Sequence, residues 1–391
     1  MTDQFEQQLT RQELLRRGVA AGSILTLPGL LAACGGTSTK SASKAAVSHT
    51  LPKTLTWSNW PLYIDVNEKT KTRPTLVAFE KHYGIKVNYV EDINDNDTFF
   101  GKIEGPLSQG QSIHRDLIVM TDYSGLPARL VELGWVEKID KSAIPNMKNL
   151  IPEQQHPAWD PNRDHSLPWQ SGFTGIGYDP KKVGGELTSI DRLLTDPKLK
   201  GKVTLLNDMP DAIGMVMLAH GNDPGHVTDA AFNQAAKAIK RAVDSGQVRQ
   251  FTGNDYAPLL AKGDVWAAMA WSGDLVQLQA DHPGLKWNLP DTGGIVWTDN
   301  MLIPKGGNIY GASVLMNWYY APKIMAEVED YVNYIPPVAG TNKALAKMDP
   351  KTAHNPLIIP TKKELSNVHQ FDTKAVNNVK YKKAFQALIG A

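Results

Sequence analysis

The sequence predicts an α/β protein made of two units, each a mostly parallel sheet flanked by helices. Short apolar runs alternate along the chain with segments of helical periodicity, which is the pattern of β-α-β units. The alternation restarts after a loop-rich stretch, so we expect the chain to cross between the two units near 172–175. With 391 residues, the chain is long enough for two domains of about 150 residues each.

The first unit is predicted from the alternation between residues 55 and 133. The expected strands are 55–60, 85–90 and 116–120, and the expected helices are 74–83, one starting at Thr98, and 126–133. The helix 74–83 has apolar residues on one face and is followed by Gly84, a common stop signal. We expect Asp97 to cap the next helix, because a carboxylate there can accept from free backbone N–H groups.

The second unit is predicted from the same alternation between residues 176 and 271. The expected strands are 176–178, 202–206 and 265–271, and the expected helices are 189–194, 212–220 and 228–244. An apolar run at 295–304 and a helix at 312–320 look like a return to the first unit. The predicted domains are therefore a first lobe of 52–172 and 297–342, and a second lobe of 173–296 and 343–391.

Residues 1–33 have the parts of an export signal: a charged head, an apolar stretch and a small-residue end. The stretch is too short for a comfortable membrane span. It ends at Cys34, the only cysteine, and the letters LAACG at 31–35 resemble the lipobox of bacterial lipoproteins. That resemblance implies cleavage before Cys34 and a lipid on its sulfur. The alternative is an ordinary secretion signal. The export route stays open between the general and twin-arginine systems, because Gln12 occupies the usual arginine place.

Residues 34–51 begin with Cys34 and are otherwise mostly small and polar, so we predict a lipidated, flexible tether.

Composition excludes several classes of function. A net charge of +1 favours neither nucleic acid nor an anionic surface as partner. Without a cysteine beyond Cys34, the body has no disulfide, thiolate metal site or cysteine nucleophile.

Catalytic signatures are missing from the sequence. It contains no G-x-S-x-G, H-E-x-x-H or phosphate-binding loop motif, and its histidines lack metal-ligand spacing. The aromatic run 318–320 could supply phenolate iron ligands, but it lies on a core-type helix and packing is the better interpretation. We therefore expect no enzyme activity, no metal and no cofactor.

Aromatic and acidic side chains recur where predicted strands end or cross. The groups are Trp60 with Tyr63, Asp122 with Tyr123, Asp208 with Asp211, Trp271 with Asp274, and Trp297 with Asp299. Ligands of open α/β sheets bind beyond the carboxyl ends of strands. An ammonium leaving water needs a carboxylate partner, and aromatic faces attract cations. The pattern indicates a site for a cationic solute.

These segments resemble the spermidine/putrescine-binding proteins of bacterial ABC transporters. The resemblance rests on SNWPLY at 58–63, DLIV at 116–119, EKIDKS at 137–142, GFTGIGY at 172–178 and GGIVWTDNMLIP at 293–304. It implies a two-lobed fold like that of type II periplasmic binding proteins, with a ligand cleft between the lobes. Carried over residue by residue, the implied aromatic box is Trp60, Tyr63, Tyr123, Trp271 and Trp297. The resemblance also implies that Asp299 pairs with an amine and that Gln370 is a further contact.

The second acidic cluster departs from the family pattern. Met209 and Ala212 occupy the aligned positions, while Asp208 and Asp211 keep the spacing one residue earlier. A shift of one residue at a helix start turns a side chain by about 100°. Asp208 and Asp211 could therefore contact the ligand or simply cap the helix. If they only cap, the preferred ligand would be shorter than spermidine or carry fewer charges.

The sequence thus predicts the solute-binding component of an ABC importer. It would be exported, lipid-anchored on the outer face of the cell membrane or in the periplasm, and would deliver a linear polyamine to its permease. Alternatives with the same fold bind an opine, an aminophosphonate or thiamine. A zwitterion would require a basic side chain in the cleft to pair with its anionic group. Two further alternatives are an exported hydrolase and a structural lipoprotein without ligand.

Overall fold

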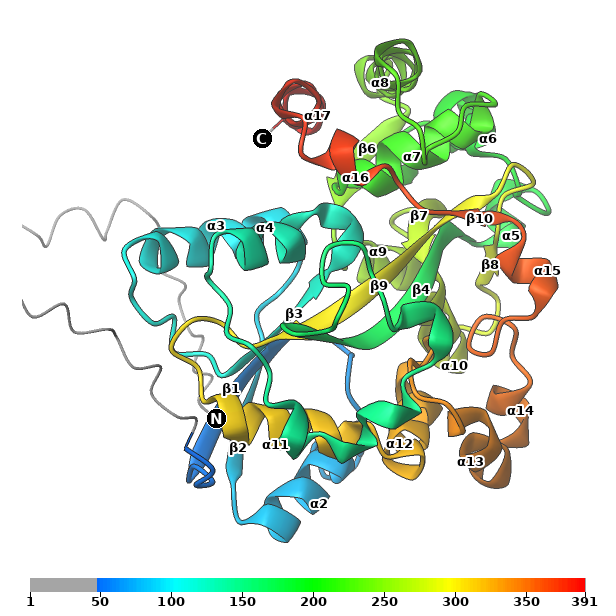
Figure 1. Ribbon diagram of the computed structural model, residues 1–391. Coiled ribbons are helices and arrows are strands. Elements are labelled where there is room, and N and C mark those ends of the chain that lie inside the picture. The colour runs from blue at the N-terminus through cyan, green and yellow to red at the C-terminus, as the bar shows by residue number, and fades with distance from the viewer. Residues whose placement is uncertain (1–47, 391) are drawn as a thin grey trace, which may run out of the picture. The chain divides into compact units, whose positions relative to one another are not determined.

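The computed structural model describes residues 48–390 and contains one ten-stranded mixed sheet flanked by helices (Figure 1). The strands are β1 (Thr54–Asn59), β2 (Lys86–Glu91), β3 (Leu117–Thr121), β4 (Ser166–Tyr178), β5 (Val203–Leu206), β6 (Val248–Thr252), β7 (Ala267–Trp271), β8 (Lys286–Asn288), β9 (Gly294–Leu302) and β10 (Val368–His369). Their order is β2-β1-β3-β9-β4-β7-β5-β6, with β8 beside β4 and β10 beside β9.

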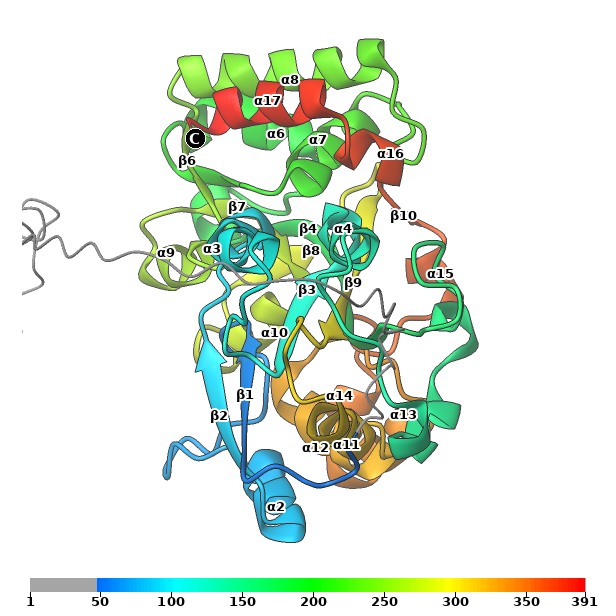
Figure 2. The same ribbon diagram turned by 60° about the vertical axis from the view of Figure 1, so that its left-hand side comes forward.

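Two lobes are built on this sheet, each around a group of parallel strands (Figure 2). The first lobe contains β1, β2 and β3 with α2 (Pro74–Tyr83), α3 (Asn96–Ser108), α4 (Leu126–Glu132), α11 (Ile309–Tyr319) and α12 (Pro322–Val332). The second lobe contains β5, β6 and β7 with α5 (Pro180–Val183), α6 (Ile190–Thr195), α7 (Met209–Ala219), α8 (Asp229–Asp244), α9 (Tyr256–Lys262) and α10 (Ser272–Asp281).

The long strands β4 and β9 run antiparallel through both lobes. At one end, β9 pairs with β3 of the first lobe, and at the other end β4 pairs with β7 of the second. Gly172 on β4 faces Trp297 on β9, and Phe173 faces Val296. The predicted lobe boundaries fall at these facing positions, so they describe one crossing made by two paired strands.

The chain continues after α12 through α13 (Thr341–Met348), α14 (Pro350–Ala353), α15 (Lys362–Leu365), α16 (Thr373–Val376) and α17 (Val379–Ile389). Leu345 of α13 and Ala353 of α14 form a small apolar cluster with Ala326 of α12, so α13 and α14 extend the first lobe. This differs from the prediction, which placed all of 343–391 in the second lobe. Only the final part packs there, where Tyr381 of α17 stacks on Phe232 of α8 with ring centroids 4.2 Å apart.

Local signals correctly predicted some helix ends and misplaced others. Helix α2 spans the predicted residues and ends at Gly84, which adopts a left-handed φ of 69°. Asp97 is not the cap of α3: the helix begins at Asn96, and the Asp95 carboxylate accepts from Thr98 N at 2.7 Å. Asp95 has the extended backbone that an N-cap requires, whereas Asp97 lies in the first turn.

Aromatic residues at the C-terminal end of α11 belong to the core of the first lobe. Tyr319 and Tyr320 are fully buried, and Tyr319 packs edge-on against Trp169 with ring centroids 5.0 Å apart. The interpretation of 318–320 as a packing segment is therefore confirmed for both tyrosines. Within the part of the chain that the structure describes, no helix has the length and apolar character needed to cross a membrane.

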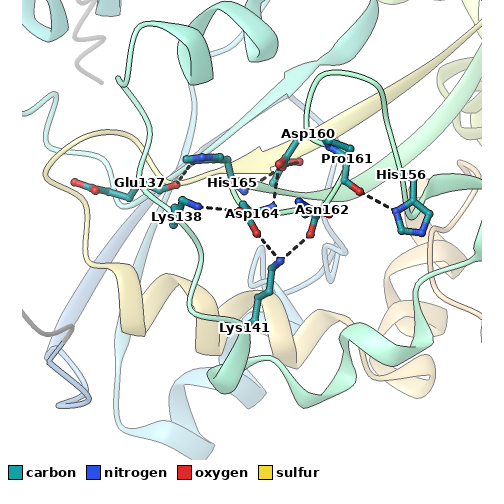
Figure 3. A network of polar contacts seen from close by, with 10 residues as sticks. Glu137, Lys138, Lys141, His156, Asp160, Pro161, Asn162, Asp164 and His165 are labelled. Carbon is teal, nitrogen blue, oxygen red and sulfur yellow. Dashed lines mark hydrogen bonds and ion pairs between the residues drawn. The ribbon is translucent and has the colours of Figure 1, made fainter. Parts of the chain in front are cut away.

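A polar network holds the loop that leads into β4 (Figure 3). The Asp164 carboxylate accepts from Lys138 Nζ at 2.8 Å and from Lys141 Nζ at 2.6 Å. Hydrogen bonds from these two lysines lower the pKa of Asp164 to about 2, because they stabilise its ionised form. The neighbouring Arg163 is buried and donates to Asn300 Oδ1 at 2.8 Å. The loop is thereby attached to β9 one residue beyond Asp299.

Candidate functional site

A cavity lies between the lobes and is lined by residues of both. Its lining residues are Trp60, Tyr63, Thr121, Tyr123, Asn254, Trp271, Asp274, Trp297, Asp299 and Tyr334. Most of them follow or end a strand: β1 and β3 from the first lobe, β6 and β7 from the second. The carboxyl ends of parallel strands therefore meet at one cavity, as open α/β sheets generally arrange them.

The aromatic side chains form a continuous wall of edge-to-face and tilted contacts. Ring centroids are 6.2 Å apart for Trp60 and Trp271, and 6.3 Å apart for Trp271 and Trp297. Tyr334 continues the series, 5.4 Å from Trp297 and 5.3 Å from Tyr63. Aromatic ring faces carry negative potential, so a cavity lined by several such rings favours a cation.

Two glycines make room for this wall. A Cβ atom on Gly172 would lie 2.5 Å from the Trp297 ring and 2.9 Å from Tyr334. A Cβ atom on Gly273 would lie 2.5 Å from the Tyr334 ring. The glycine-rich crossing segment noted in the sequence thus has a packing role, since any larger residue would push an aromatic side chain out of the wall.

Asp299 is the cavity carboxylate contributed by β9. Its side chain is 4% exposed, and it accepts from Tyr63 Oη at 2.5 Å and from Thr121 Oγ1 at 2.6 Å. Burial raises the pKa of Asp299 to about 7, because a desolvated charge is costly, and the two hydrogen bonds offset only part of this effect. The carboxylate is held in place by its neighbours but lacks a cationic partner.

Asp274, in the first turn of α10, is the second cavity carboxylate. It accepts from Tyr334 Oη at 2.6 Å, from Tyr256 Oη at 2.7 Å and from Asn254 Nδ2 at 3.3 Å. Burial raises the pKa of Asp274, opposed by these three hydrogen bonds. Tyr256 also accepts from Trp271 N at 3.0 Å, so the acidic group and the aromatic wall are joined.

No lysine, arginine or histidine lines this cavity. Among residues 48–390, the ion pairs do not include Asp299, Asp274 or Asp211. Buried carboxylates without a cation are costly unless a ligand supplies one. The arrangement is suited to binding an organic cation with more than one positive charge.

Asp211 lies behind the wall and does not line the cavity. Its carboxylate is fully buried and accepts from Thr174 Oγ1 at 2.6 Å, Tyr123 Oη at 2.7 Å and Trp271 Nε1 at 3.1 Å. Burial raises its pKa to about 6. Asp211 therefore positions two aromatic residues and, through Tyr123, joins the second lobe to the first.

Asp208, Asp122 and Gln370 also lie outside the set of cavity residues. Asp208 is at the N-cap position of α7, but its side chain makes no capping hydrogen bond; it accepts instead from Asn96 Nδ2 at 3.3 Å. Asp122 accepts from Thr298 N at 3.1 Å, and burial raises its pKa to about 6. Gln370 is exposed beyond β10. The capping interpretation of Asp208 is wrong, because its carboxylate is turned toward the first lobe.

Sequence reasoning missed Thr121, Asn254 and Tyr334 as cavity residues. Thr121 ends β3 and Asn254 follows β6, so the strand-end rule could have found both had the strand at 248–252 been recognised. Tyr334 follows a helix, and no local pattern sets it apart. Cys34 and the predicted export signal lie outside the described residues.

This chain is similar to known proteins in sequence and in fold. Residues 75–357 match the family model described as bacterial extracellular solute-binding protein. The spermidine/putrescine-binding periplasmic protein of Escherichia coli K12 is 29% identical over 344 residues, covering 86% of this chain and 91% of the relative. A putrescine-binding periplasmic protein of Pseudomonas aeruginosa is 29% identical over 339 residues, covering 82% and 87%.

Among solved structures, a putative spermidine/putrescine ABC transporter from Listeria monocytogenes superposes with a TM-score of 0.74 at 26% identity. The match covers 86% of this chain and 99% of that one. The predicted two-lobed fold is therefore confirmed, as is the predicted resemblance to polyamine-binding proteins. The family model and the names of these relatives describe transport components rather than enzymes.

Proposed function

We propose that this chain, which belongs to the family of bacterial extracellular solute-binding proteins, captures a linear polyamine and delivers it to the permease of an ABC importer. The observation that carries the proposal is the pair Asp274 and Asp299: two buried carboxylates without cations, in one cavity walled by aromatic rings. Each would accept one ammonium group, and the rings would cover the methylenes between them. The relatives named for spermidine and putrescine support the same class of solute.

A diamine of the putrescine type suits the cavity better than a triamine. Only Asp274 and Asp299 line it as acids, while Asp211 lies behind the aromatic wall and does not line the cavity. The far charge of spermidine would therefore lack a carboxylate within the cavity. We propose a preference for two positive charges over three.

The rival solutes differ in charge. An opine, an aminophosphonate or another zwitterion carries an anionic group, and no basic side chain lines the cavity to receive it. Thiamine carries a single ring-bound cation and would leave one carboxylate unpaired. For a hydrolase the cavity offers no serine, cysteine or histidine. These observations favour a flexible dication.

Binding would act by closure of the lobes. Trp60, Tyr63 and Asp299 reach the cavity from the first lobe or the crossing strands, and Trp271 and Asp274 reach it from the second. A ligand that contacts both sides stabilises the closed state over the open one, because only the closed state offers all contacts. The permease would then recognise the closed form.

Anchoring on the outer face of the cell membrane or in the periplasm is part of the proposal and rests on Cys34 after the LAA triplet. Stable anchoring requires more than one acyl chain. Cys34→Ala should release the protein from the membrane fraction, as measured by fractionation and immunoblotting. Membrane retention of this variant would exclude the lipid anchor.

Calorimetric titration tests the ligand assignment. Putrescine should bind more tightly than spermidine, and both much more tightly than butylamine, which has the same carbon chain and one charge. 1,4-Butanediol, the uncharged match, should not bind. Tighter binding of an amino acid or opine than of any polyamine would contradict the proposal.

A further inference from the structure

Asn96 connects the cavity to the opposite lobe through its side-chain amide. It is 1% exposed at the start of α3, in the first lobe. Its Oδ1 accepts from Thr121 N at 3.0 Å, and its Nδ2 donates to Thr121 Oγ1 at 3.0 Å and to Asp208 Oδ2 at 3.3 Å. Both amide hydrogens and the carbonyl oxygen are therefore in use.

The next bond in the chain reaches Asp299. Thr121 Oγ1 donates to Asp299 Oδ1 at 2.6 Å. A hydroxyl that donates its hydrogen becomes a better acceptor, and the Thr121 oxygen accepts from Asn96 Nδ2 while its hydrogen goes to Asp299. The hydrogen bonds thus run in one direction, from Asn96 through Thr121 to Asp299.

The other amide hydrogen of Asn96 crosses between the lobes. Asp208 belongs to the second lobe and borders a separate cavity together with Asp97 of the first lobe and Lys382 of α17. Asp208 is 7% exposed, and none of the ion pairs among residues 48–390 includes it. Because the two partners belong to different lobes, this bond exists only when the lobes are together.

We infer that Asn96 is a positioning residue that links the occupancy of Asp299 to closure of the lobes, an inference that rests on the proposed function. A cation on Asp299 keeps that carboxylate ionised and therefore accepting. The Thr121 hydroxyl then points at Asp299, its oxygen accepts from Asn96, and the amide is held in the orientation that reaches Asp208. An unoccupied, protonated Asp299 can donate to Thr121 instead, so that the Thr121 oxygen accepts from two donors and its bond with Asn96 loses the strengthening that came from donation to Asp299.

Variants of both partners test the link, with putrescine as the probe. Asn96→Ala removes the crossing bond and should raise the putrescine dissociation rate about 10- to 100-fold, the range for a lost hydrogen bond to a charged group, with little change in association rate. Asn96→Asp should raise the dissociation rate further, because it places a second carboxylate next to that of Asp208. Combining N96D with Asp208→Asn puts the amide donor on the second lobe and the carboxylate acceptor on the first, so a hydrogen bond between the two positions can form again. The double variant should therefore recover part of the lost putrescine residence time.

Closure is measured as the distance between labels on the two lobes. Exposed Lys81 on α2 and Lys237 on α8 can be changed to cysteine in a C34A background, which leaves no other thiol. At saturating putrescine, N96A and Asp208→Ala should each lower the closed fraction. Asp208→Ala provides the test from the second lobe if N96A fails to fold.

A double-mutant cycle separates this link from ordinary lobe contact. Gln277 also crosses between the lobes, donating to Leu62 O at 3.3 Å, but it has no bond to Asp299 or Thr121. The effect of N96A should shrink in a Thr121→Val background, whereas the effect of Gln277→Ala should be the same in both. If the parent binds putrescine and N96A leaves dissociation and closure unchanged, the inference is overturned. If the parent does not bind any polyamine, the proposed function fails instead.

Discussion

Tyr123 of the first lobe donates its phenolic hydrogen to Asp211 of the second lobe, with 2.7 Å between Oη and Oδ2. The same carboxylate holds the indole of Trp271 at 3.1 Å. An acid that the sequence suggests as a ligand contact is thus a support for the aromatic wall. The carboxylates that line the cavity are Asp274 and Asp299.

Tyr123→Phe should weaken putrescine binding about 10- to 100-fold, because it removes a hydrogen bond to a buried carboxylate and leaves the ring in place. Isothermal titration calorimetry measures the affinity. Tyr381→Phe is the matched control: it removes a similar bond, 2.7 Å to Asp229, on the outside of the second lobe. Equal losses in the two variants would contradict a specific role for the bond between the lobes.

Asp299→Asn and Asp274→Asn should each cost about 2–5 kcal/mol of putrescine binding, since each removes one partner of a desolvated charge pair. The loss should be much smaller for butylamine, which can use the remaining carboxylate. Asp229→Asn, on the surface, should leave both affinities unchanged. Unaltered putrescine binding in D299N would exclude Asp299 as an ammonium partner.

Putrescine affinity should rise as the pH increases from about 5.5 to 8. Burial, and to a smaller extent repulsion by Asp122 and Asp211, raises the pKa of Asp299 to about 7, so below that pH the ligand must displace a proton. Calorimetry in buffers of different ionisation enthalpy should detect proton release on binding near pH 6. A flat pH profile, or proton uptake, would argue against this carboxylate.

The ligand-free protein should show the opposite trend in stability. A carboxyl whose folded pKa is raised favours folding when protonated, so its contribution is present at about pH 4 and lost as the pH rises through about 7. Melting temperatures of the parent should therefore fall over this range more than those of D299N. Putrescine should restore the melting temperature of the parent near pH 8, because it binds the protein with Asp299 ionised.

Gly172→Ala should lower both stability and affinity, because its Cβ would lie 2.5 Å from the Trp297 ring. Thermal melting and putrescine titration measure the two effects. Gly101→Ala is the matched control, since nothing lies within 4 Å of its Cβ and the position is inside α3. That change should stabilise the protein by up to about 1 kcal/mol. If Gly172→Ala changed neither the melting temperature nor the putrescine affinity, Trp297 could move without consequence and the packing role of Gly172 would be wrong.

Much of the fold follows from local patterns. Helix α2 could be placed from its apolar face and Gly84 alone, because 3.6-residue periodicity and a left-handed stop are local properties. The apolar run that became β3 and the aromatic–acid pairs at strand ends were equally visible. These signals predicted Trp60, Tyr63, Tyr123, Trp271, Asp274, Trp297 and Asp299, all of which line the cavity.

The sequence by itself determined the α/β class, the aromatic–acidic character of the site and most of its members, since each depends on neighbours along the chain. Only the tertiary structure decided which acids line the cavity. Asp208 and Asp211 have the same residue type and lie on one helix start, yet the first reaches Asn96 and the second holds Tyr123 and Trp271. Tyr334 likewise joined the cavity through the packing of distant segments. The direction of a buried side chain depends on partners far away in sequence, and local patterns do not specify them.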